Sequence, residues 1–191
     1  MGSGQEKVDN KVGYFTTFTT SEPNSKTYIE YKQNGNSSWS ANSYWDDTME
    51  NTGCGITSMA IILSGYGKEK SPEDLRKKYY PVLNGNKISN ELSKTFKIKN
   101  SDFYYDGVHL SNEYIINHLK SNRPVLVCVW KQNGENRWTT ASHYMVLLAT
   151  DGASKVYVSN PNGIEDYKAS GWYDIKEITP YVAKALFIED Y

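Results

Sequence analysis

The sequence is poor in cysteine, with two in 191 residues, Cys54 and Cys128. A chain of this length held by disulfides has more of them, so a disulfide scaffold is excluded. A single Cys54–Cys128 bridge remains the alternative to two free thiols. Long apolar runs are also missing, and none approaches the roughly 20 residues that cross a bilayer. The formal net charge is −1, so no global basic field favours nucleic acid or an anionic membrane.

Internal repeats, low-complexity tracts and a domain boundary after residue 26 are absent as well. A chain of 191 residues is long enough for one domain with a substantial core. Residues 1–4 resemble the remnant of an expression tag. Residues 5–25 are mostly polar, and we interpret them as an N-terminal arm and not as a core element. We therefore expect a tag remnant and arm over 1–26 and one domain over 27–191.

A cysteine between two glycines, Gly53-Cys54-Gly55, precedes the longest helical pattern. Apolar residues fall at i, i+3, i+4 and i+7 over 56–63, and further isoleucines make this helix apolar nearly all round. The pattern predicts a central, buried helix with Cys54 at its N-terminus. The helix dipole and free N–H groups there favour an anion, so we expect the thiol to lose its proton readily. The flanking glycines leave the sulfur uncrowded and let a substrate approach the backbone.

Helices are expected first along the chain and strands later. Ser71 and Ser111 have the sequence features of helix N-caps, and a short helix is expected over 88–96. Apolar, β-branched runs predict strands separated by Asn-Gly and Asp-Gly turns; they are 125–130, 143–150, 155–159 and 185–188. This segregation predicts the α+β class with an antiparallel sheet.

The histidines differ in their expected surroundings. His109 falls in a loop and His118 on an exposed helical face, whereas His143 lies at the mouth of an apolar strand. Asn160 ends the next strand, so antiparallel pairing would bring it beside His143. There its amide would hold the imidazole in the tautomer that takes a thiol proton, although a plain turn before Pro161 is the alternative. We interpret Cys128, inside a continuous apolar run, as core packing.

Several of these segments match a known family in order and spacing. They are Tyr31-Lys32-Gln33, Trp39, Tyr44, Gly53-Cys54-Gly55-Ile56-Thr57-Ser58-Met59-Ala60, Ser71-Pro72-Glu73-Asp74-Leu75, Arg123-Pro124-Val125, Ser142-His143-Tyr144, Val158-Ser159-Asn160-Pro161 and Gly171-Trp172-Tyr173. With them the chain resembles the papain-like cysteine peptidases, specifically the group related to bacteriocin-leader-processing peptidases. The resemblance implies a papain-like fold, with N-terminal helices and a central nucleophile helix packed on a C-terminal antiparallel sheet.

The same resemblance implies residue roles. Cys54 would be the nucleophile, His143 the general base and then acid, and Asn160 the residue that orients His143. Gln33 would donate to the oxyanion together with the Cys54 backbone N–H. Peptide bonds would be hydrolysed through a thioacyl-enzyme intermediate, with no cofactor and no metal.

Trp39, Trp45, Gly53 and Ser142 are the expected substrate-binding residues. Trp138 and Trp172 could extend a peptide groove, although packing is the alternative for such aromatic residues. Two other functions stay open: a non-catalytic peptide-binding domain, and a papain-like acyltransferase or amidase. We expect a free-standing monomer that acts on a peptide or protein outside a bacterial cell or at its surface.

Overall fold

The computed structural model describes residues 7–9, 14–35, 38–130, 138–162 and 169–190. The tag-like residues 1–4 lie outside them. The helices are α1 (Met49–Thr52), α2 (Cys54–Gly65), α3 (Pro72–Tyr79), α4 (Ile88–Lys94) and α5 (Asn112–Leu119), with 3₁₀ turns η1 (Gly85–Lys87), η2 (Ile175–Glu177) and η3 (Thr179–Tyr181). The strands are β1 (Lys7–Asp9), β2 (Tyr14–Thr19), β3 (Thr27–Ile29), β4 (Ser43–Tyr44), β5 (Asp47–Thr48), β6 (Lys99–Tyr104), β7 (Val125–Trp130), β8 (Ser142–Thr150), β9 (Lys155–Ser159), β10 (Gly171–Asp174) and β11 (Val182–Asp190).

The main sheet has six strands in the order β10-β9-β8-β7-β11-β6, and every neighbouring pair is antiparallel. Five of the six come from the C-terminal part of the chain, as the strand patterns predict. The sixth, β6, precedes α5 and lies at one edge. The antiparallel α+β class expected from the sequence is confirmed.

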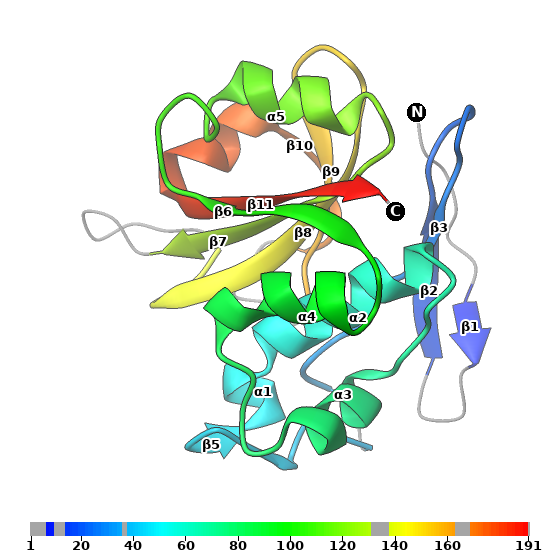
Figure 1. Cartoon of the computed structure of the whole chain (residues 1–191), viewed down its shortest axis with the longest axis vertical. Helices are drawn as coiled ribbons and strands as arrows, with labels where there is room; N and C mark the ends of the chain where they lie inside the picture. Colours follow the sequence, from blue (N-terminus) through cyan, green and yellow to red (C-terminus); the bar gives the residue numbers. More distant parts are fainter. Residues whose placement is uncertain (1–6, 10–13, 36–37, 131–137, 163–168, 191) are drawn as a thin grey trace.

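Helices cover both faces of this sheet, with α5 on one side and α2 and α4 on the other (Figure 1). Two apolar clusters follow from this arrangement. One joins α2 to inward residues of β8 such as Val146 and Leu148, and the other joins α5 to alternate residues such as Met145 and Leu147. The alternation reflects the two-residue period of a strand buried on both faces.

Helix α2 is the most deeply buried helix. Its residues 56–63 are all nearly inaccessible to solvent, as expected for a helix that is apolar all round. Helices α3 and α5 begin at the expected caps. The Ser71 hydroxyl accepts from the Asp74 N–H in a capping box, and the Ser111 hydroxyl accepts from the Tyr114 N–H.

The expectation that residues 5–25 stay outside the core is wrong for 14–20. Strand β2 pairs with β3 in a small sheet with β1, and Phe15 and Phe18 are buried. The Phe18 ring stacks on Tyr157 of β9, with centroids 3.7 Å apart. Threonines separate the two phenylalanines and make the segment polar on average, so its overall composition conceals two core residues.

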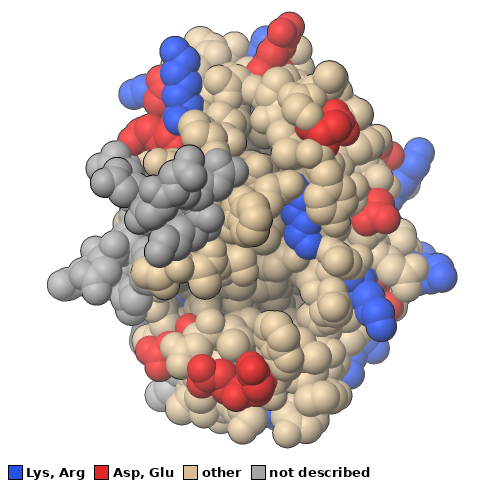
Figure 2. Space-filling view, turned by 90° about the vertical axis from the view of Figure 1, so that its left-hand side faces the viewer, with Lys and Arg blue, Asp and Glu red and all other residues tan. Residues whose placement is uncertain are grey.

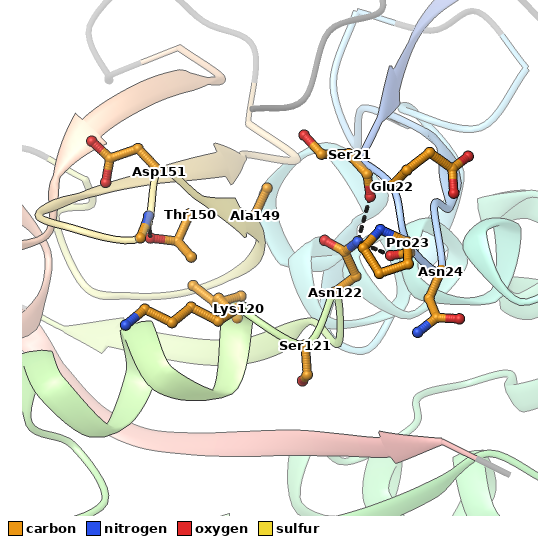
Figure 3. A pocket seen from close by; sticks show the side chains of 12 residues that line it. Ser21, Glu22, Pro23, Asn24, Lys120, Ser121, Asn122, Ala149, Thr150 and Asp151 are labelled. Carbon is orange, nitrogen blue, oxygen red and sulfur yellow. Dashed lines mark hydrogen bonds between the residues drawn. The ribbon is translucent and has the colours of Figure 1, made fainter.

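The tip of the β2–β3 hairpin is also fixed to the domain. The side-chain amide of Asn122, after α5, donates to the carbonyl oxygens of Ser21 (2.5 Å) and Pro23 (2.8 Å). These residues border a polar cleft of about 280 Å³ that also includes Lys120 and Asp151 (Figure 3). The hairpin therefore belongs to the folded unit.

Candidate active site

Cys54 is the first residue of α2, and Gly53 is the N-cap. Both thiols are free; Cys54 as a whole residue is of intermediate exposure, and Cys128 on β7 is buried. The two cysteines are therefore not bridged, and Cys128 packs in the sheet as expected. The backbone N–H groups of Cys54 and Gly55, at the helix start, and of Tyr144 on β8 all face the Cys54 sulfur.

The burial of the thiol contradicts the ready ionisation expected of Cys54. Burial raises the pKa of the Cys54 thiol to about 11, although the three N–H groups that face it act in the opposite direction. Desolvation disfavours the thiolate more strongly than the helix start favours it. A base is therefore required to take the thiol proton.

His143 and Asn160 lie side by side, as the sequence predicts. The ring Nε2 of His143 is 2.7 Å from Oδ1 of Asn160. Sheet register brings them together, because Val146 of β8 pairs with Ser159 of β9 and Asn160 follows directly. A role for Asn160 as a turn residue alone does not account for this contact with the His143 ring.

The hydrogen bonds around Asn160 also define the tautomer of His143. The backbone N–H of Asn162 donates to Asn160 Oδ1 at 2.9 Å, so this atom is the amide oxygen and an acceptor. Nε2 must then carry the hydrogen, which leaves Nδ1 unprotonated in the neutral ring. Burial lowers the pKa of His143 to about 4; the Asn160 contact opposes this, and the nearby charge of Lys32 reinforces it. At neutral pH the ring is thus an uncharged base.

Gln33 lies on the segment that follows β3 and is buried. Its side-chain Nε2 donates to the carbonyl oxygen of Glu50 at 2.8 Å, while its Oε1 has no hydrogen-bond partner among the residues that the structure describes. Because an amide nitrogen carries two hydrogens, one donor remains after the Glu50 contact. Gln33 borders the same cavity as Cys54 and His143.

Two cavities meet at Cys54. The first, of about 270 Å³, is bordered by Gln33, Cys54, Ser142 and His143. The second, of about 450 Å³, is more apolar, and its lining includes Tyr44, Trp45, Cys54, Val82, Leu83 and Tyr144. Both open near the start of β8, and this side of the molecule is hollowed and bordered mainly by uncharged residues (Figure 2).

The four expected substrate-binding residues divide into two pairs. Trp45, 65% exposed, lines the apolar cavity, and Ser142 lines both cavities. Trp39 is instead completely buried, stacks on Phe15 and donates its indole N–H to the Lys32 carbonyl oxygen. It belongs to the core, so its assignment to substrate binding is wrong.

Gly53 has a packing role at the start of α2. A Cβ there would lie 2.5 Å from the carbonyl oxygen of Met49, so glycine permits the tight junction of α1 and α2. Gly53 borders neither cavity at Cys54. Its expected contact with substrate stays a prediction.

The more distant tryptophans are packing residues too. Trp138 is completely buried and donates to the Glu177 carbonyl oxygen. Trp172 is partly buried, and its ring packs edge-on against Tyr157. Neither borders the cavities at Cys54.

The other histidines lie away from these cavities. His109 pairs with Asp106 and stacks on Tyr104. His118 was expected to be exposed, but its ring packs against Phe187, with centroids 4.9 Å apart. Burial lowers the pKa of His118 to about 4.

Sequence reasoning missed two groups of residues near Cys54. The walls of the apolar cavity include Val82 and Leu83, which come from a connection without a periodic pattern. Lys32 contacts Asn160 from 128 positions earlier in the chain, and Ser170 contacts it from 10 positions later. Only the position of Lys32 next to Gln33 could have drawn attention to it.

The central buried helix α2, packed on a six-stranded antiparallel sheet, is the arrangement of the papain-like class of fold. The Peptidase_C39 like family matches residues 26–183, and the chain belongs to this family. The family resemblance and the papain-like fold expected from the sequence are both confirmed. No curated protein sequence matches the chain.

Similar solved structures include the following two. The peptidase domain of Streptococcus ComA, a bi-functional ABC transporter involved in quorum sensing, has a TM-score of 0.51 and 18% identity, over 72% of this chain and 91% of that domain. A double glycine motif protease from an AMS/PCAT transporter, in complex with the leader peptide, has a TM-score of 0.47 and 17% identity, over 72% and 84%. In the part of this chain that the structure describes, no helix has the length and hydrophobicity of a membrane span.

Proposed function

We propose that this protein is an active cysteine peptidase that hydrolyses peptide bonds through a thioacyl-enzyme at Cys54. Membership of the Peptidase_C39 like family supports the general class. The observation that carries the specific proposal is the His143–Asn160 hydrogen bond beside the cavity that Cys54 also lines. An imidazole held by an amide next to a helix-start thiol is an arrangement suited to nucleophilic catalysis.

Acylation begins with attack of the Cys54 sulfur on the carbonyl carbon of the scissile peptide bond. The thiol proton passes to Nδ1 of His143, the nitrogen that its contact with Asn160 leaves free. Both groups are uncharged in the resting protein. Proton transfer in the presence of substrate therefore activates the nucleophile, and the imidazolium that forms donates to Asn160 Oδ1 through Nε2.

The tetrahedral intermediate carries its charge on the former carbonyl oxygen. The backbone N–H of Cys54 and the remaining side-chain N–H of Gln33 are the proposed donors to that oxyanion. Collapse of the intermediate breaks the C–N bond, and His143 gives its proton to the leaving amine. Water then attacks the thioester and gives a proton to His143. Collapse of this second intermediate breaks the C–S bond, and His143 returns the proton to the sulfur, which leaves the acid and the free thiol.

The substrate is proposed to be a peptide or protein with an apolar side chain near the cleavage site. The more apolar cavity borders Cys54 directly and has Trp45 at its exposed rim, and apolar burial is the main source of affinity there. One of the similar solved structures contains a leader peptide. For this chain, the apolar lining of the cavity supports an apolar side chain in the substrate.

The experiment is hydrolysis of a peptide library by the purified protein, with acid quenching and mass spectrometry of the intact chain. A thioester on Cys54 and cleaved peptides are the expected result. A non-catalytic peptide-binding domain would bind peptides without forming the thioester, which would overturn the proposal. An acyltransferase would form the thioester but pass the acyl group to an added amine in preference to water.

A further inference from the structure

Lys32, directly before Gln33, is a partly buried cation beside the proposed active site. Its Nζ donates to the carbonyl oxygen of Asn160 at 2.6 Å and to the hydroxyl of Ser170 at 3.0 Å. Burial lowers the pKa of Lys32, and the nearby carboxylate of Glu30 opposes that effect. Lysine is among the residues least often buried, because desolvation of an ammonium is costly. Its contacts at this position therefore require an explanation.

These contacts hold the backbone of Asn160 from both sides. The Asn160 N–H donates to the Ser170 hydroxyl at 2.8 Å, and the Asn160 carbonyl oxygen accepts from Lys32. The side-chain oxygen of Asn160 accepts from the N–H of Asn162. Asn160 thus presents Oδ1 to His143 from a residue whose backbone N–H and carbonyl are both bonded.

The same contact begins a set of hydrogen bonds between residues 32–34 and 160–162. The backbone N–H of Gln33 donates to the Pro161 carbonyl oxygen at 2.8 Å, and the Asn34 amide donates to the Asn162 side chain at 2.8 Å. One segment carries the proposed oxyanion donor and the other carries the residue that orients His143. Their relative position determines whether both act on one substrate.

We propose that Lys32 is a positioning residue, which fixes Asn160 against the Gln33 segment and thereby holds the His143 ring in its reactive orientation. The role rests on the proposed peptidase function and adds a residue to its machinery. Lys32 touches neither the sulfur nor the ring, and it borders neither cavity at Cys54.

The charge of Lys32 provides a readout that a purely structural role would not change. Burial is the largest cause of the lowered pKa of His143, and the charge of Lys32 lowers this pKa further, while the hydrogen bond with Asn160 raises it. The other ionisable groups that border the His143 cavity are Cys54 and Glu50. Removal of the Lys32 charge leaves these in place, so the pKa of His143 should rise.

The test compares Lys32→Met with Lys26→Met. Lys26 is a matched control, since its Nζ also donates to a backbone carbonyl, that of Asn122, beside the polar cleft of Figure 3. For Lys32→Met we expect kcat to fall about tenfold or more with KM within about twofold, because an orienting contact acts on the reaction step. The His143 pKa, followed by NMR of labelled imidazole, should rise. Lys26→Met should change neither quantity.

Ser170→Ala keeps the positive charge but removes a hydroxyl that both Lys32 and Asn160 use. It should lower kcat without raising the His143 pKa, and it decides the matter if Lys32→Met does not fold. Wild-type kcat and an unchanged His143 pKa in a folded Lys32→Met protein would overturn the proposal. So would wild-type kcat in Ser170→Ala.

The NMR measurement needs no turnover, so the peptidase function and the positioning role of Lys32 can be rejected independently. If the wild type cleaves no peptide, the peptidase proposal fails. Nitrogen shifts would still report whether Lys32→Met displaces the hydrogen from Nε2 of His143. An unchanged tautomer and pKa would then reject the role of Lys32 as well.

Discussion

His143 and Asn160 are 17 positions apart in the chain, yet the ring Nε2 and the amide Oδ1 lie 2.7 Å from each other. The backbone N–H of Asn162 requires that Oδ1 be an acceptor. The orientation of the ring thus depends on the β8–β9 register and on one backbone donor. This relationship determines which imidazole nitrogen carries the hydrogen in the neutral ring.

Asn160→Ala tests this contact directly. The change frees the His143 ring to rotate and removes the acceptor for Nε2, so kcat/KM should fall by about tenfold to a thousandfold. Asn160→Asp should be tolerated, because a carboxylate accepts the same hydrogen bonds and stabilises the imidazolium. The measurement is kcat/KM on a peptide that the wild type cleaves, with thermal melts to verify folding. Activity of Asn160→Ala within about twofold of wild type would leave a Cys-His dyad.

Cys54→Ala should abolish turnover and leave the fold intact. Cys54 begins α2 and lines the two cavities that meet there, so loss of its sulfur enlarges an existing opening and creates no new internal cavity. Peptide cleavage and circular dichroism are the two measurements. Residual hydrolysis by a correctly folded Cys54→Ala protein would refute the cysteine-peptidase mechanism.

Cys128→Ala is the matched control for that variant. Cys128 is buried on β7 and its thiol is free, so activity should be preserved. The free energy of unfolding should fall by about 1–2 kcal/mol. Reducing agent should leave the melting temperature of the wild type unchanged, and a large shift would mean that the two cysteines form a disulfide in solution.

Two tryptophans should respond in opposite ways. Trp45→Ala removes a 65% exposed side chain from the rim of the apolar cavity, so KM should rise with little change in stability. Trp39→Ala removes a completely buried side chain and should cost about 3–5 kcal/mol of stability. Kinetics and denaturant unfolding distinguish the two. A Trp45→Ala enzyme with wild-type KM would exclude this tryptophan from substrate binding.

Acid should destabilise the protein through His143. Its native pKa is lowered from 6.5 to about 4, so between these values the unfolded chain binds a proton that the native protein does not. The free energy of unfolding therefore falls as pH falls through this window, by on the order of 3 kcal/mol for this group. Denaturant unfolding from pH 4 to pH 8 should show a smaller loss in His143→Gln. Equal losses in the two proteins would mean that His143 titrates normally.

The sequence alone determined the main elements around Cys54. The apolar run over 56–63 predicts a buried helix, and the Gly53-Cys54-Gly55 segment before it places Cys54 at the helix N-terminus. Both follow from the sequence because periodicity and helix termini are local properties. The strand that begins near His143 and the strand that ends before Asn160 were also predicted, from their apolar runs. Their closeness followed from the assumption of antiparallel neighbours, which the sheet order bears out.

Tertiary structure decided the properties that depend on what surrounds each side chain. The local sequence predicted that Trp39 binds substrate, but in the fold Trp39 stacks on Phe15 of β2 in the core. It also predicted a lowered pKa for Cys54, but burial raises that pKa. The polarity of residues 5–25 concealed that Phe15 and Phe18 complete the core. The contact of Lys32 with Asn160, between positions 128 apart, exists only after folding. Desolvation and long-range hydrogen bonds are properties of the folded environment, and no local pattern encodes them.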